Sequence, residues 1–157
     1  MSDFVFNIAK GRVAELYNRV DQSDPTNAVL VVVAINTTAT DAVLRDLDTL
    51  ALVLANANTA EVANTGYSRI VLDQDDLAAL APDDSNDRMD LDLADFDFGA
   101  ITDDDVDWTD LLICYDPDST GGDDSAIIPL TCHDFPMEID GSNVSAELNA
   151  AGFYRAS

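Results

Sequence analysis

The segment from Asp116 to Asp124, DPDSTGGDD, gathers carboxylates around two glycines and is the part of the chain best suited to hold a cation. Asp116, Asp118, Asp123 and Asp124 would supply the oxygen ligands that Ca²⁺ prefers. However, the twelfth position counted from Asp116 is Ile127, where an EF-hand loop has a bidentate glutamate, and the flanking segments have the composition of strands. The pattern favours a solvated hairpin turn, with a weak calcium site as the alternative.

The sequence contains one histidine, His133, which directly follows Cys132. Adjacent residues of a strand point to opposite faces, so these two side chains are not expected to form a nucleophile–base pair. A glycine-rich phosphate loop, a nucleophile elbow and zinc-ligand spacing are all missing from the sequence. We therefore expect a structural histidine, no enzyme activity and no cofactor.

Acidic residues dominate the charge, with 31 Asp and Glu against 7 Lys and Arg, and the formal net charge is −24 over 157 residues. Of the acids, 27 are aspartates, which favour turns, caps and strand ends, whereas glutamate favours helix interiors. A negative charge of this size repels nucleic acids and anionic membranes and suits a cationic partner. The hydrophobic fraction of 47% nevertheless indicates a folded domain with a sizeable core.

The first residues combine aromatic and basic side chains. Phe4 and Phe6 alternate with Val5, and Lys10 and Arg12 follow closely. The two aromatic side chains are either ordinary core residues or anchors of an extended docking arm over residues 1–10, in which Lys10 and Arg12 supply a cationic edge. The candidate partner-binding residues are Phe4, Phe6, Lys10 and Arg12.

Hydrophobic periodicity predicts helices in the first part of the chain and strands throughout the rest. Spacing of three and four residues predicts helices over 11–20 and about 40–55, and a helical turn is expected over 75–80. The run AVLVVVAI over 28–35 is apolar throughout and predicts a central strand covered on both faces. Further strands are expected at 67–72, 89–98, 108–115, 126–135, 137–139, 144–148 and 153–155.

Two irregular positions are expected in these strands. In RMDLDLADFDF, residues 88–98, apolar and acidic residues alternate, and the alternation slips at Ala94–Asp95, which predicts a bulge or corner. Pro129 predicts a strand edge or a bulge. Cys114 and Cys132 lie in strand-like segments and are expected to be buried and reduced, with a disulfide between neighbouring strands as the alternative.

Together these features predict one domain over residues 1–157, mainly β with N-terminal α elements. About seven short strands and frequent turns favour a single-domain antiparallel β-sandwich or a jelly-roll-like fold with one or two short helices. The start of the chain lacks the pattern of a signal peptide, and the longest apolar run is too short to span a bilayer.

Five segments follow one another along the chain: DFVFNIAKGRVAELYNRV, GYSRIVL, DDSNDRMDLDL, LLICYDPDSTGGDDSAIIPLTCHDF and AAGFYRAS. Their pattern and order resemble the small virion structural proteins of tailed bacteriophages, of the capsid decoration or minor capsid type, over nearly the whole chain. The resemblance implies a non-enzymatic protein of the capsid exterior, assembled in the host cytoplasm. It also implies binding to the major capsid protein and self-association around the symmetry axes of the shell, without nucleic acid or membrane.

Other functions remain open at this point. A head–tail connector or a tail component of the virion has the same general character. An acidic DNA mimic that inhibits nucleic-acid-binding proteins is a different class, but it needs carboxylates spaced like phosphates over an elongated surface. Here the acids cluster in turns and alternate with core residues, which fits a globular sheet better.

Overall fold

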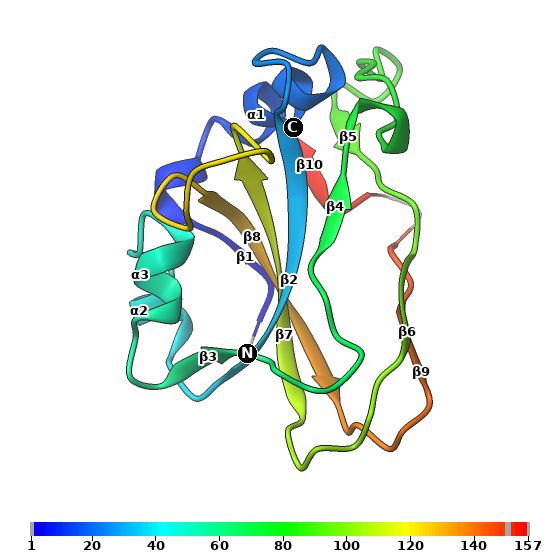
Figure 1. Ribbon diagram of the computed structural model, residues 1–157. Coiled ribbons are helices and arrows are strands. Elements are labelled where there is room, and N and C mark those ends of the chain that lie inside the picture. Colours follow the sequence, from blue (N-terminus) through cyan, green and yellow to red (C-terminus); the bar gives the residue numbers. More distant parts are fainter. Residues whose placement is uncertain (1, 150–151, 157) are drawn as a thin grey trace.

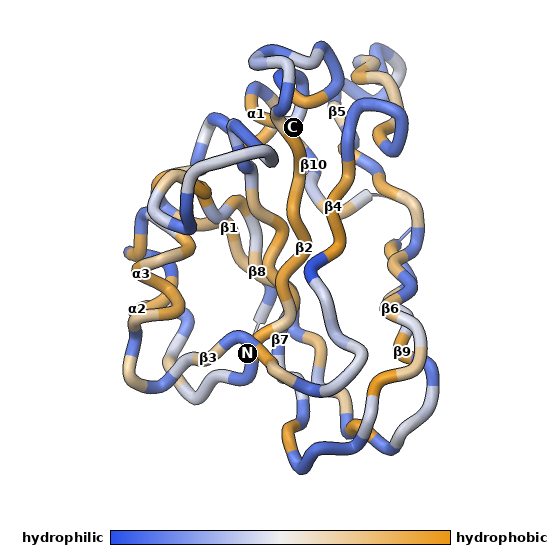
Figure 2. Tube along the Cα trace, viewed as in Figure 1, coloured by the Kyte–Doolittle hydropathy of each residue, from blue (hydrophilic) through white to orange (hydrophobic). Residues whose placement is uncertain are grey.

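The computed structural model describes residues 2–149 and 152–156, and its centre is the strand β2 (Val29–Thr37) (Figure 1). Eight of the nine β2 residues are buried, and Figure 2 shows the strand as a nearly continuous hydrophobic segment. Its neighbour β7 (Trp108–Asp116) pairs with it antiparallel from Val29 opposite Asp116 to Ile35 opposite Asp110. Because β2 is apolar on both faces, further elements must cover both sides of this sheet.

The main sheet has six strands in the order β1–β8–β7–β2–β3, and β4 lies beside β2 as well. Two separate two-stranded ribbons, β5–β10 and β6–β9, complete the β structure. All pairings are antiparallel, which confirms the predicted mainly β fold. The remaining strands are β1 (Phe4–Val5), β3 (Thr59–Glu61), β4 (Ile70–Leu72), β5 (Met89–Leu91), β6 (Phe96–Ala100), β8 (Ile128–Met137), β9 (Asn143–Ala146) and β10 (Tyr154–Ala156).

Three short α-helices and two 3₁₀ turns accompany the strands. They are α1 (Val13–Asp21), α2 (Asp41–Leu44), α3 (Leu50–Leu54), η1 (Asn7–Ala9) and η2 (Gln74–Asp76). Figure 1 shows α2 and α3 on one side of the main sheet and the β6–β9 ribbon on the other. Other elements therefore lie on both sides of the sheet, and eight of the nine β2 residues are buried.

The amphipathic helix predicted over 11–20 is confirmed by α1, whose apolar stripe is buried. The single helix predicted over about 40–55 is wrong, because the structure has two short helices there. Thr49 starts α3 by accepting a hydrogen bond on its hydroxyl from the Leu52 N–H at 3.3 Å. Polar residues between the helices compete for backbone groups in this way and favour a new cap over a continuous helix.

The alternating segment RMDLDLADFDF forms two strands with different partners. β5 pairs with β10 and β6 pairs with β9, so the predicted irregularity at Ala94–Asp95 is a corner between ribbons. Leu91, Leu93 and the two phenylalanines are buried, whereas Asp92, Asp95 and Asp97 face solvent. A further register shift occurs opposite Pro129, as predicted, because the β7–β8 ladder is irregular between Ile113 and Cys114.

An aromatic cluster fixes the β6–β9 ribbon on the main sheet. Trp108 of β7 meets Phe98 of β6 edge to face at 4.9 Å between ring centroids, and Tyr67 at 5.4 Å. The Trp108 Nε1–H donates to the Asn64 side-chain oxygen at 3.0 Å, so its polar atom is satisfied in the core. This cluster makes the ribbon a fixed second layer.

The N-terminal segment belongs to the core, which corrects the expectation of a docking arm over residues 1–10, of which 2–10 are described. Phe4 pairs with Cys132 across β1 and β8, and the Phe6 N–H donates to the Leu130 carbonyl at 3.0 Å. Phe4 is 8% exposed and Phe6 is fully buried. The alternation that suggested an arm is the pattern of an edge strand, because β8 needs a partner along this side.

Replacing Phe6 tests this assignment. Phe6→Ala removes a fully buried aromatic ring, so we expect the free energy of unfolding to fall by about 3–5 kcal/mol. Urea unfolding followed by tryptophan fluorescence measures the change. The exposed Lys10→Ala variant serves as the control and should unfold like the parent protein. A Phe6→Ala protein as stable as this control would show that the segment is not part of the core.

Candidate functional site

Two adjoining hollows lie beside the histidine, and we call them together the His133 groove. The larger has a volume of about 260 Å³ and the smaller about 160 Å³, and they share Asp3, His133 and Phe153. The larger hollow lies between the main sheet and the β6–β9 ribbon, because its walls come from β6, β7, β8 and β9. Strands far apart in the sequence therefore build this site together.

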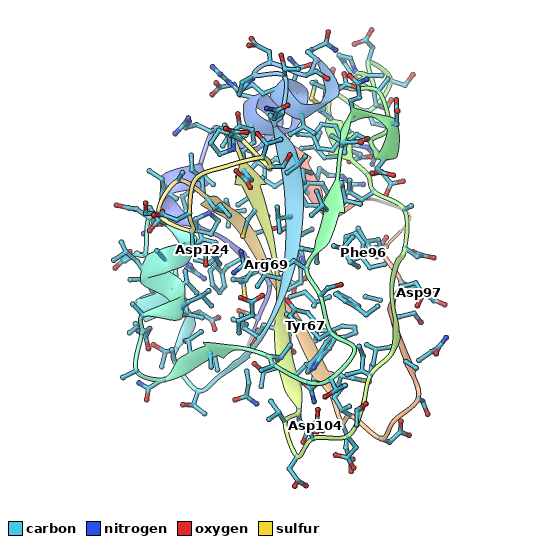
Figure 3. The ribbon with its side chains drawn as sticks, in the orientation of Figure 1. Tyr67, Arg69, Phe96, Asp97, Asp104 and Asp124 are labelled. Atoms are coloured by element: carbon cyan, nitrogen blue, oxygen red, sulfur yellow. The ribbon has the colours of Figure 1, made fainter. Side chains whose placement is uncertain are left out.

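The floor of the groove is apolar and partly aromatic. Leu111 and Ile113 of β7 form it together with Phe96 of β6, and Phe135 and Phe153 line its sides. Figure 3 shows Phe96 directed toward the sheet and Asp97 directed away from it, which is the alternation of a strand with one solvated face. Apolar contact area is thus available to a ligand on this side of the molecule.

Side chains around the rim carry negative charge. Asp3 and Glu147 line the larger hollow, and its lining among the described residues includes no lysine or arginine. The groove therefore combines an apolar floor with an acidic rim, an arrangement that attracts a cation and repels a phosphate.

Hydrogen bonds hold His133 at both ring nitrogens. Nε2 lies 2.9 Å from the Thr131 hydroxyl and Nδ1 lies 3.4 Å from the Asp3 carboxylate, whose other oxygen accepts from the Asp134 N–H at 2.9 Å. The order hydroxyl, imidazole, carboxylate is that of a nucleophilic triad. However, Thr131 is only 2% exposed, so its hydroxyl is closed to a substrate and the chain of contacts serves to position the histidine.

Comparisons with protein-family models, with curated proteins and with solved structures gave no match for this chain. None of the helices within residues 2–149 and 152–156 is long and apolar enough to cross a membrane. What the protein binds must therefore follow from its own side chains, and the His133 groove is its best-defined concave site.

The acidic turn that sequence reasoning singled out uses its carboxylates internally. Asp118 accepts hydrogen bonds on one oxygen from the Thr120 N–H at 3.1 Å and the Thr120 hydroxyl at 2.6 Å. Asp116 accepts from the Asp118 N–H at 3.0 Å, and Asp123 accepts from the Ser125 N–H at 2.8 Å. Across the part of the chain that the structure describes, no group of three or more Asp, Glu, His and Cys side chains converges as metal ligands would.

The fourth carboxylate of that turn, Asp124, takes part in an ionic clamp. Arg69 lies between Glu61 and Asp124, with nitrogen–oxygen distances of 2.6 and 2.7 Å, and each carboxylate receives two hydrogen bonds from the guanidinium (Figure 3). The hydrogen bonds that Arg69 donates to Glu61, and then those to Asp124, raise the pKa of the guanidinium. The clamp joins β3 and the residue before β4 to the β7–β8 turn.

Asp110 is a buried carboxyl outside the groove. It is 1% exposed, burial raises its pKa, and its Oδ2 has no partner among the described residues. The Cys132 thiol lies 3.7 Å from its other oxygen. Because Leu111 and Ile113 face the groove, their neighbour Asp110 points to the opposite face of the sheet. Both cysteines are buried free thiols.

The four candidate partner-binding residues do not form one surface. Phe4 and Phe6 are core residues, whereas Lys10 and Arg12 are exposed, and Arg12 pairs with Glu15 at 3.5 Å. Sequence reasoning missed the groove because its walls meet only after folding. One local signal was available, since the acidic and apolar residues of RMDLDLADFDF showed that Phe96 faces inward.

A second pattern that sequence reasoning missed concerns the aspartates in loops. Eight of them accept a hydrogen bond from the backbone N–H two residues further along, forming Asx turns. They are Asp73, Asp83, Asp97, Asp103, Asp116, Asp118, Asp123 and Asp140. For five of these turns the sequence signal was an aspartate two residues before Ser, Thr or Gly, as in Asp140-Gly-Ser142, and in the other three a second aspartate holds that position.

Among the other aspartates, four accept, at 3.1 Å or less, from backbone N–H groups more than 30 residues away in the sequence. Asp95 accepts from Leu148 at 2.8 Å, Asp104 from Thr65 at 2.6 Å and Asp107 from Ile139 at 3.1 Å. The fourth is the Asp3 contact at the groove. Aspartate side chains thus fasten loops where a regular ladder is missing.

Removing the cation of the ionic clamp should destabilise the protein. Arg69→Gln leaves Glu61 and Asp124 partly buried and mutually repelling, so we expect a loss of about 2 kcal/mol in the free energy of unfolding. Arg12→Gln removes a surface ion pair and is the matched control, expected within about 0.5 kcal/mol of the parent. Equal stabilities of the two variants in urea would contradict a structural role for the clamp.

The Asx turns predict a defined pH dependence. Side-chain hydrogen bonds hold the pKa of four aspartates below 3.8, namely Asp83, Asp118, Asp123 and Asp140. A depressed carboxyl pKa contributes stability that is present above the unfolded value and is lost as the pH falls through the folded value. Asp118→Ala should therefore be less stable than the parent at pH 7, and the difference should shrink as the pH falls below 3.8, the ordinary pKa of the carboxyl group.

Urea unfolding of both proteins at a series of pH values measures this difference. Asp84→Ala removes an exposed aspartate for which the structure shows no hydrogen bond, and it is the control. A stability difference for Asp118→Ala that does not shrink at all as the pH falls through the acid range would mean that the carboxylate charge is not responsible.

Proposed function

We propose that this protein is a non-enzymatic structural component of a tailed-phage virion, a decoration protein that binds the outer surface of the major capsid shell. The observation that carries the proposal is the resemblance of five ordered segments to such proteins. Three of these segments contain β1 with most of α1, β4, and most of the β7–β8 hairpin, whereas the central strand β2 lies outside all five. The resemblance therefore concerns a large part of the main sheet around β2.

Protected sheet edges support this proposal. On the outer side of β8, β1 covers Thr131 and Cys132, and the Asp134 N–H is already bound by the Asp3 carboxylate. The next N–H of this edge is missing because residue 136 is proline. An edge closed in this way resists pairing with a neighbouring copy. A protein packed in many copies on one shell needs that protection.

The acidic exterior supports it as well. A strong net negative charge keeps decorated particles apart in suspension and repels free nucleic acid. It also leaves a basic surface of the shell as the natural counterpart. Since Phe4 and Phe6 are in the core, the His133 groove takes the place of the N-terminal arm as the surface proposed to meet the shell.

Counting the protein in purified particles tests the proposal. Quantitative mass spectrometry of virions, referenced to the major capsid protein, should find hundreds of copies per particle. A dozen copies or fewer would indicate a connector or tail component instead. Absence from the particle, combined with competition against duplex DNA for a nucleic-acid-binding enzyme, would favour the DNA mimic.

A further inference from the structure

We propose that the His133 groove binds a basic segment of its partner, taking an arginine or lysine side chain beside Glu147 and a neighbouring apolar side chain onto the floor. This inference rests on the proposed function for the source of the segment, the capsid shell. The chemistry of the ligand, however, follows from the groove alone.

The size and lining of the groove define the kind of ligand. About 260 Å³ lies just under the range of pockets that enclose whole small molecules, so it suits one or two side chains of a larger partner. Leu111, Ile113 and Phe135 offer apolar contact. Phe153 adds an aromatic ring at the junction of the two hollows, where the face of a ring attracts a guanidinium or ammonium group.

Glu147 is the carboxylate available to the ligand. It is exposed, and the structure shows no hydrogen bond or ion pair for it within residues 2–149 and 152–156. Asp3 is already engaged with His133 and with the Asp134 N–H. A cation that enters the groove therefore meets an uncommitted carboxylate at the rim and does not have to break a native contact.

Recognition has to proceed through side chains and not through strand addition. The β8 edge next to the groove has lost its N–H donors, one to the Asp3 carboxylate and one to Pro136. An extended peptide cannot continue the sheet there. The partner segment must therefore place its side chains in the hollow. Specific recognition then requires that the segment carries one cationic side chain next to one apolar side chain.

Two variants distinguish a direct contact with Glu147 from the long-range attraction of the negatively charged protein. Glu147→Lys reverses the charge at the rim, and Glu138→Lys makes the same change at an exposed glutamate that does not line the groove. The probe is the peptide acetyl-Gly-Arg-Leu-Arg-Gly-amide, titrated at low salt while NMR follows the His133 ring and the Leu111 and Ile113 methyl groups. A peptide with glutamine in place of both arginines is the ligand control.

We expect the arginine peptide to shift the groove signals and the glutamine peptide to leave them unchanged. Glu147→Lys should weaken binding at least tenfold, whereas Glu138→Lys should stay within threefold of the parent. Equal losses for the two variants would overturn the proposal, because the long-range field alone would then explain the attraction. Shifts confined to residues outside the groove would also overturn it.

A second measurement distinguishes this inference from the proposed function. Purified shells that lack the protein are mixed with the parent, Glu147→Lys or Glu138→Lys, and the bound fraction is measured after sedimentation. Selective loss of binding for Glu147→Lys supports the groove as the shell contact. If both variants coat shells like the parent, the groove assignment fails while the capsid function stands. If the arginine peptide binds but no form sediments with shells, the capsid function fails and the groove chemistry stands.

Discussion

The hydrogen bond from a backbone N–H to an aspartate side chain is the interaction on which the loops of this protein depend. Short strands leave many backbone amides outside any ladder, and a buried or crowded amide without a partner is costly. Asx turns satisfy such groups locally, and the contacts from Asp95, Asp104 and Asp107 do so over long distances. The excess of aspartate over glutamate thus has a structural cause, because only the shorter side chain closes these turns. The net charge follows from how the loops are built.

So many like charges destabilise a compact chain, and two features of the structure offset that repulsion. Most carboxylates are spread over solvated turns, where screening is strong. At two points a guanidinium lies between carboxylates: Arg69 separates Glu61 from Asp124, and Arg88 lies 3.4 Å from Asp83 and 3.0 Å from Asp90. The apolar β2–β7 pair then supplies the burial that holds the chain together.

Local patterns in the sequence were sufficient to predict α1, the central position of β2 and the corner at Ala94–Asp95. Each of these depends on residues within one short window. The interrupted helix over 40–55 depends on competing caps, so periodicity alone gave the wrong result there. The edge strand at Phe4 depends on a distant partner strand, so the sequence left core packing and a docking arm as alternatives. The His133 groove was unpredictable for a stronger reason. Its rim and floor combine Asp3, residues of β7 and β8, and the segment after β9, and no single window contains two of its walls.

The same interaction that builds the loops also explains why the groove is suited to binding. Asp95 fixes the backbone at Leu148, immediately beside Glu147, so the rim has a defined position without using the Glu147 carboxylate. Hydrogen bonds with Asp3 and Thr131 likewise fix the orientation of the His133 ring. Because hydrogen bonds already fix this part of the backbone, the protein loses little further conformational entropy when a partner binds to Glu147. Carboxylates with structural roles thus fix the walls of the groove. Glu147, for which the described residues offer no hydrogen bond or ion pair, is the group with which a basic segment would pair.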